Sequence, residues 1–110
     1  MWADLLPVGR HAGTGGYRRF AWTREDATLR EWFAAEAAAR RLTLTLDRAG
    51  NQWAWWGDPD ADGPGVVVGS HLDSVPDGGA FDGPLGVSVR SPRWTRCALP
   101  APRRTGRSPW

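Results

Sequence analysis

Apolar residues recur at helical spacing over the range 23–41, which predicts an amphipathic helix. Its apolar face consists of Leu29, Trp32, Phe33 and Ala37. Thr23 can cap the first turn, and Asp26, three residues later, is a weaker form of the capping box. Arg40 and Arg41 fall in the predicted last turn, where positive charge is favoured by the helix dipole. We expect this helix to cover one face of a sheet.

The pattern then changes to a period of two. Residues 42–47 alternate leucine with threonine, which places three leucines on one face of a half-buried strand. Residues 48–51 supply a turn, and residues 52–56 return as a second strand of a hairpin. The three tryptophans of this second strand are able to form a stacking platform for a sugar or a base. Cross-strand packing is the more frequent use of such residues, and we favour it here.

Val66, Val67 and Val68 form a continuous β-branched run, the pattern of a strand buried on both faces of a parallel or mixed sheet. Open α/β folds place their ligands at the carboxyl edge of such strands. A polar cluster that contains His71 and Asp73 begins at that edge. The helix, the hairpin and the buried strand together predict an α/β fold with a mixed sheet.

Three side chains in this region have the chemistry of a metal site. Imidazole is a common zinc ligand, and a carboxylate such as Asp73 can accept the other ring N–H of His71 and fix its tautomer. Asp82 follows nine residues after Asp73, and its two oxygens are enough to bridge two metal ions. Without further context these three residues are a weak signal, and a structural histidine explains them more often than a metal site does.

Composition narrows the class of protein. A chain of 110 residues holds at most one small domain, and a single cysteine, Cys97, excludes an internal disulfide framework and a cysteine-based zinc site. Residues 1–87 carry eight arginines against all 12 acidic residues, a net charge of −4, which does not favour nucleic acid or an anionic membrane as a partner. The sequence shows neither a leader peptide nor an apolar span, so we predict a cytoplasmic protein.

The segment from Gly69 to Val87, GSHLDSVPDGGAFDGPLGV, closely resembles the first metal motif of the allantoate amidohydrolase and N-carbamoyl-L-amino-acid hydrolase family. That family belongs to the binuclear-metal aminoacylase/carboxypeptidase superfamily. The resemblance extends back through the predicted helix to Thr14-Gly15-Gly16 and covers about residues 10–87. The stretch 52–59 is most similar to the allantoate branch.

The resemblance implies roles for the three polar residues. His71 would bind one metal ion, Asp82 would bridge a pair, and Asp73 would orient His71. The two ions would be zinc or manganese, and they would activate water for attack on a ureido or amide carbon. The substrate would be allantoate or an N-carbamoyl amino acid, and the enzyme would be a homodimer that binds neither nucleic acid nor a membrane. Family members supply a glutamate pair and further histidines from beyond the region matched here, so we expect this chain alone to be inactive.

The segment 88–110 departs from the family pattern. It holds six arginines and no acidic residue, and its four prolines oppose a long helix. These are Pro92, Pro100, Pro102 and Pro109. We predict that residues 1–87 are the N-terminal part of a metallohydrolase catalytic domain and that 88–110 form an irregular, disordered tail, which a frameshift near Gly86 to Val89 would explain. The alternative function is a small non-catalytic binding module that uses the tryptophan hairpin and the basic tail.

Overall fold

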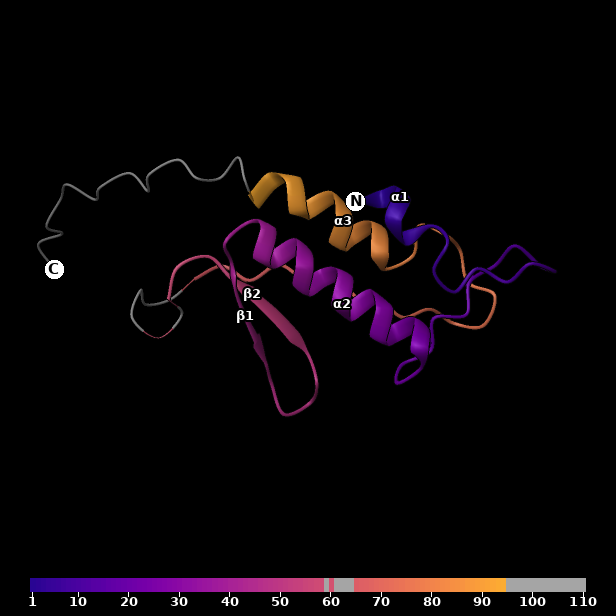
Figure 1. Cartoon of the computed structure of the whole chain (residues 1–110), viewed down its shortest axis with the longest axis horizontal. Coiled ribbons are helices and arrows are strands. Elements are labelled where there is room, and N and C mark those ends of the chain that lie inside the picture. The colour runs from indigo at the N-terminus through magenta and orange to yellow at the C-terminus, as the bar shows by residue number, and fades with distance from the viewer. Residues whose placement is uncertain (59, 61–64, 95–110) are drawn as a thin grey trace, which may run out of the picture.

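A computed structural model describes residues 1–58, 60 and 65–94 of the chain (Figure 1). Three helices and one antiparallel hairpin follow one another along the sequence: α1 (Trp2–Leu5), α2 (Arg24–Ala39), β1 (Thr43–Leu46), β2 (Gln52–Trp55) and α3 (Pro84–Trp94). The predicted α/β class is confirmed, with α2 lying between the hairpin on one side and α1 and α3 on the other. No helix in these described ranges is long and apolar enough to cross a membrane.

The first turn of α2 is capped as the sequence predicted. Thr23 is the N-cap residue, and its hydroxyl oxygen accepts a hydrogen bond from the backbone N–H of Asp26 at 3.5 Å. The Asp26 carboxylate accepts in turn from the backbone N–H of Trp22 at 3.0 Å. The cap therefore bonds one backbone donor that the helix start leaves unpaired, that of Asp26, and the Asp26 side chain also ties down the residue before the cap. On the inner face of α2, Leu29 and Ala37 are fully buried.

The other end of α2 differs from the prediction. The helix ends at Ala39, so Arg40 and Arg41 follow the last turn instead of lying in it. Arg41 takes the left-handed conformation at φ 57°, and the backbone N–H of Leu42 donates to the Ala37 carbonyl at 3.0 Å. The N–H of Arg41 also donates to the Ala38 carbonyl, at 2.9 Å. This is a Schellman motif, which reverses the chain so that β1 packs back on α2.

The hairpin has the predicted strands and turn. Its register pairs Thr43 with Trp55 and Thr45 with Trp53, so the two indoles lie on the same face. Their rings stack at 5.8 Å between centroids and 13° between planes. The Trp55 indole N–H of β2 donates to the Thr45 hydroxyl of β1 at 2.9 Å. This contact between Trp55 and Thr45 confirms the predicted cross-strand packing.

The leucine face of the hairpin is only partly covered. Leu44 is half-buried, whereas Leu46 is 63% exposed near the turn, beyond the reach of α2. The side-chain amide of Gln52 donates to the Arg30 carbonyl of α2 at 3.2 Å, so the helix lies on the side away from the stacked indoles.

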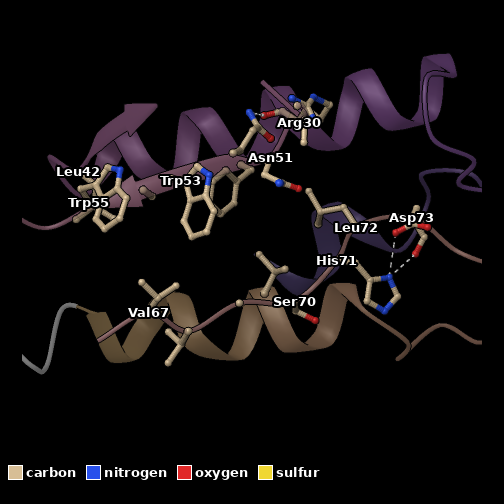
Figure 2. Close-up of a pocket in the computed structure, with 18 of the residues that line it drawn as sticks. Arg30, Leu42, Asn51, Trp53, Trp55, Val67, Ser70, His71, Leu72 and Asp73 are labelled. Carbon is tan, nitrogen blue, oxygen red and sulfur yellow. Dashed lines mark hydrogen bonds and ion pairs between the residues drawn. The ribbon is translucent and has the colours of Figure 1, made fainter. Parts of the chain in front are cut away.

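The buried strand predicted at Val66–Val68 is wrong for this chain. The segment forms no strand, and its three side chains are 95%, 57% and 54% exposed. No backbone hydrogen bond joins it to the other described residues. It runs past α3, and at its end Ser70 packs on that helix (Figure 2). A β-branched run becomes a buried strand only when other strands flank it, and the described part of the chain offers no neighbour.

The irregular tail predicted from residue 88 is also wrong over its first part, because α3 continues to Trp94. Pro84 is the first residue of this 11-residue helix, a position where proline is well tolerated. Pro92 lies close to the end, so its missing N–H deprives only the Ser88 carbonyl of a donor. Val87 and Ser88 are buried. The predictions of disorder and of a frameshift product for residues 95–110 fall outside the described residues.

Candidate metal centre

His71 and Asp73 lie together at the end of the Val66–Ser70 segment (Figure 2). The Nδ1 atom of His71 is 3.1 Å from the Asp73 backbone carbonyl and 3.1 Å from its carboxylate Oδ1. Both partners accept hydrogen bonds, so Nδ1 carries a proton, and in the neutral imidazole Nε2 keeps a lone pair. This arrangement gives His71 the tautomer that a metal ligand needs.

Asp82 approaches the same imidazole from the other side. Its Oδ1 is 3.7 Å from Nε2 of His71, and both side chains are about half exposed. Asp82 also precedes the first turn of α3, where the helix dipole favours a negative charge. In the neutral imidazole, the Nε2 lone pair and the carboxylate oxygen that face each other repel unless a cation lies between them, whereas in the protonated imidazole the Nε2 proton faces the carboxylate directly. The pair is therefore a candidate cation site.

Gly83 makes this approach possible. Its φ is +54°, a conformation that residues with a side chain rarely adopt. A Cβ at this position would lie 2.6 Å from both Nδ1 and Cε1 of His71. The Gly83 carbonyl accepts a hydrogen bond from the Ser70 hydroxyl at 2.9 Å. The segments that contain Ser70 and Gly83 are thus in direct contact beside the His71 ring. A residue larger than glycine does not fit at position 83.

The distance between the two candidate ligands fits a divalent ion. Zinc binds histidine nitrogen and carboxylate oxygen at about 2.0–2.2 Å, so two such bonds at a wide angle span a separation near 3.7 Å. The ligand set is incomplete, because the ranges 1–58, 60 and 65–94 contain no group of three or more metal-binding side chains. These described residues therefore bring together two candidate ligands, fewer than a closed metal site needs.

The candidate site lies at one end of a broad cavity of about 1140 Å³. Trp53 and Trp55 line it from the hairpin, and Val67 lines it from the opposite segment (Figure 2). His71 and Asp73 are part of the same lining. The face of the hairpin that carries the stacked indoles is thus turned, across the cavity, toward the segment 66–73 that carries His71.

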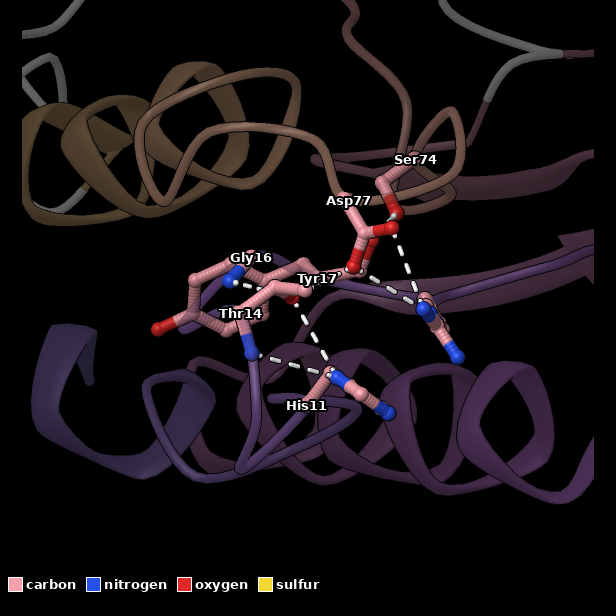
Figure 3. A network of polar contacts seen from close by, with 7 residues as sticks. His11, Thr14, Gly16, Tyr17, Ser74 and Asp77 are labelled. Atoms are coloured by element: carbon pink, nitrogen blue, oxygen red, sulfur yellow. Dashed lines mark hydrogen bonds and ion pairs between the residues drawn. The ribbon is translucent and has the colours of Figure 1, made fainter.

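Sequence reasoning missed a polar cluster that holds the loop between Asp73 and Asp82 (Figure 3). Asp77 accepts hydrogen bonds from the Thr14 hydroxyl at 2.6 Å and from two nitrogens of Arg18 at 3.1 and 3.2 Å. The hydrogen bonds from Arg18 and Thr14 lower the pKa of the Asp77 carboxyl. The partners are 63 and 59 residues apart in the sequence, and no local pattern signals such a contact.

Comparisons with known proteins place the chain beside hydrolases. No family model matches the sequence. The chain is 41% identical over 87 residues to a putative hydrolase of Mycolicibacterium smegmatis, covering 78% of this chain and 19% of the relative. It is 37% identical over 89 residues to an N-carbamoyl-L-amino acid amidohydrolase of Geobacillus stearothermophilus, covering 79% and 22%. The chain thus spans about a fifth of the length of these curated relatives.

A solved structure shows the same relationship in three dimensions. The crystal structure of a hydantoinase/carbamoylase family amidase from Burkholderia ambifaria superposes with a TM-score of 0.72 at 36% sequence identity. The match covers 86% of this chain and 24% of the amidase. The matched part of this chain therefore has the same arrangement as one part of the amidase.

Proposed function

We infer the function from one premise: in sequence and in fold, the chain corresponds to part of a protein of the N-carbamoyl-L-amino-acid amidohydrolase and allantoate amidohydrolase family. The identity, at 36–39% in three comparisons, extends over most of this chain but over only a quarter or less of each relative. Activity, substrate and metal content are therefore proposals for this chain, which matches one part of each relative.

We propose that this chain supplies the first half of a metal centre that hydrolyses the C–N bond of an N-carbamoyl amino acid or of allantoate. The observation that carries the proposal is the convergence of His71 Nε2 and Asp82 Oδ1 at 3.7 Å, with Asp73 on the other ring nitrogen. Divalent ions at such a centre polarise a scissile carbonyl group and lower the pKa of a water molecule. Zinc and manganese both suit nitrogen and carboxylate ligands.

Each residue has a distinct task. Asp73 holds the proton on Nδ1, which keeps the Nε2 lone pair of His71 directed toward the centre. Asp82 offers two carboxylate oxygens, enough for one oxygen to each of two ions. Gly83 allows the carboxylate to come this close. The homodimer that the resemblance implies stays a prediction, and so does the allantoate branch.

A chimera tests the proposal. The segment of the Geobacillus amidohydrolase that this chain matches would be replaced by the corresponding residues of this chain, and hydrolysis of an N-carbamoyl amino acid would be measured with added Zn²⁺ or Mn²⁺. We expect metal-dependent turnover from the chimera and none from the isolated chain, because two ligands do not complete a centre.

Matched substitutions locate the activity. Asp82→Asn in the chimera should lower kcat/KM more than about 100-fold, beyond the loss usual for residues that only orient ligands. Asp60→Asn makes the same chemical change at an exposed aspartate outside the site and should leave the rate unchanged. A folded, zinc-loaded chimera without activity, or one whose rate survives Asp82→Asn, would contradict the proposal.

A further inference from the structure

We propose that Arg18 and Asp77 are positioning residues: their ion pair clamps the loop between His71 and Asp82 to the N-terminal segment, and so keeps the two candidate ligands directed at one point. This inference rests on the proposed metal function and names residues that the function did not include. Neither residue touches the candidate centre. They act on His71 and Asp82 only by fixing the backbone of the loop that joins these two residues.

The loop has little structure of its own. Between Asp73 and Pro84 the chain contains turns but neither helix nor strand. Asp77 itself lies in the left-handed region at φ 54°, an uncommon conformation for a residue other than glycine. The separation of His71 and Asp82 is therefore set by the Ser70–Gly83 hydrogen bond at the ends of the loop and by what holds its middle.

Backbone hydrogen bonds join this middle to residues near the start of the chain. Tyr17 and Gly78 exchange two bonds, at 2.9 and 3.1 Å, as in a short antiparallel bridge. The Ser74 N–H donates to the Arg19 carbonyl at 2.9 Å, and the Ser74 hydroxyl accepts from the Arg19 N–H at 3.0 Å. Ser74 is buried, so these bonds are shielded from water.

The N-terminal side of the clamp is firmly anchored. Arg19 is fully buried, and its guanidinium donates to the carbonyls of Leu5 and Val8 at 2.7 and 2.9 Å. It also stacks over the Tyr17 ring at 4.1 Å. The Tyr17 hydroxyl donates to the Leu6 carbonyl at 2.8 Å. The loop is thus tied to buried residues of the fold.

The Arg18–Asp77 pair adds side-chain contacts at the outer edge of this bridge (Figure 3). Two guanidinium nitrogens contact the two carboxylate oxygens, a geometry that fixes direction as well as distance. Gly16 lies beneath, and a Cβ there would be 2.7 Å from Asp77 Cα, so the two segments are in van der Waals contact. Loss of the pair should let the turn at Asp77 relax.

Arg18→Met separates positioning from simple electrostatics. Removing a positive charge from this region should strengthen Mn²⁺ binding if only charge matters. If Arg18 positions the loop, the same substitution should weaken binding. Arg10→Met is the matched control, because it removes the same charge from the same segment, while the Arg10 side chain makes no hydrogen bond to another described residue in the structure.

The experiment uses the whole 110-residue chain, labelled with ¹³C and ¹⁵N, and Mn²⁺ alone as the probe. Paramagnetic broadening of the His71 ring and Asp82 amide signals reports binding, and amide hydrogen exchange at Ser74 and Gly78 reports the clamp without metal. In Arg18→Met we expect Mn²⁺ affinity to fall about 3- to 5-fold, the range of an exposed ion pair. Exchange at Ser74 and Gly78 should rise by a similar factor. Arg10→Met should leave exchange unchanged and should not weaken Mn²⁺ binding.

The outcomes are distinct. Equal or tighter Mn²⁺ binding in Arg18→Met, or unchanged exchange at Ser74 and Gly78, would overturn the positioning role and leave the proposed metal site intact. Absence of broadening at both His71 and Asp82 in the unsubstituted chain would overturn the claim that these two residues alone hold a cation, and the positioning role with it, whereas the chimera tests the proposed function separately.

Discussion

Asp47 closes the hairpin turn with its carboxylate. One oxygen accepts from the backbone N–H groups of Ala49 and Asn51, both at 2.9 Å. The other accepts from the Asn51 side chain at 2.8 Å and from the Trp53 indole at 3.1 Å. These bonds, those from Asn51 foremost, lower the pKa of Asp47 to about 2. A single carboxylate therefore joins the turn to the first of the stacked tryptophans.

The lowered pKa predicts how the hairpin responds to acid. Because the folded form has the lower pKa, the stabilisation is complete above the ordinary value of 3.8 and is lost as the pH falls through about 2. Carboxyl ¹³C titration should give a midpoint near 2 for Asp47, and Asn51→Ala should raise it toward the ordinary value. A midpoint that Asn51→Ala leaves unchanged would contradict this explanation.

Single residues also show what sequence alone could identify at the site. His71, Asp73 and Asp82 were predicted together, and the structure brings all three within hydrogen-bonding distance or slightly beyond. Sequence alone could identify these three residues because they lie close together in the chain and their side chains are common metal ligands or partners of ligands. The roles of Arg18 and Asp77 were not predicted, because a contact between residues 59 positions apart leaves no periodic trace.

At the scale of elements, the end of α2 carries the clearest strain. Arg41 occupies the left-handed position of the Schellman motif, where glycine is the usual residue. The side chain of Arg41 costs free energy in this conformation because its Cβ crowds the following carbonyl. The turn keeps it because the chain must reverse there for β1 to pack on α2.

Arg41→Gly should therefore stabilise the protein, by about 0.5–1 kcal/mol in the free energy of unfolding. Ala38→Gly is the matched control. Ala38 is also exposed, but it lies within the last turn of the helix, where glycine costs about 1 kcal/mol. Chemical denaturation of both variants should give opposite signs. Destabilisation by Arg41→Gly would show that its side chain makes a contact worth more than the strain.

Sequence predicted well those elements whose stabilising contacts come from residues of the same segment. Helix α2 carries its own cap and its own apolar face, and the hairpin carries both partners of each cross-strand pair. The run Val66–Val68 has an equally plain pattern, but a buried strand needs neighbours that the described chain does not provide. The prolines of the segment 88–110 oppose a long helix, but α3 is only 11 residues long and begins at Pro84, where proline is tolerated.

At the scale of the whole molecule, the exposed valine run should affect solubility. An apolar segment with no neighbouring strand is a site at which a second chain can pair. Val67→Lys should therefore raise the monomer fraction in size-exclusion chromatography with light scattering. Val75→Lys is the control, because Val75 is 66% exposed but lies outside the run. Equal improvement by both variants would assign the effect to net charge instead.

The clamp between residues 14–19 and the loop at 74–78 also sets an order of events during synthesis. Its hydrogen bonds join residues 55 to 63 positions apart, whereas α2 and the hairpin close contacts over far shorter distances. A chain that has left the ribosome only as far as the hairpin can form those elements but not the clamp. The loop that holds the candidate ligands therefore acquires its shape later than α2 and the hairpin, when its own residues can reach the N-terminal segment.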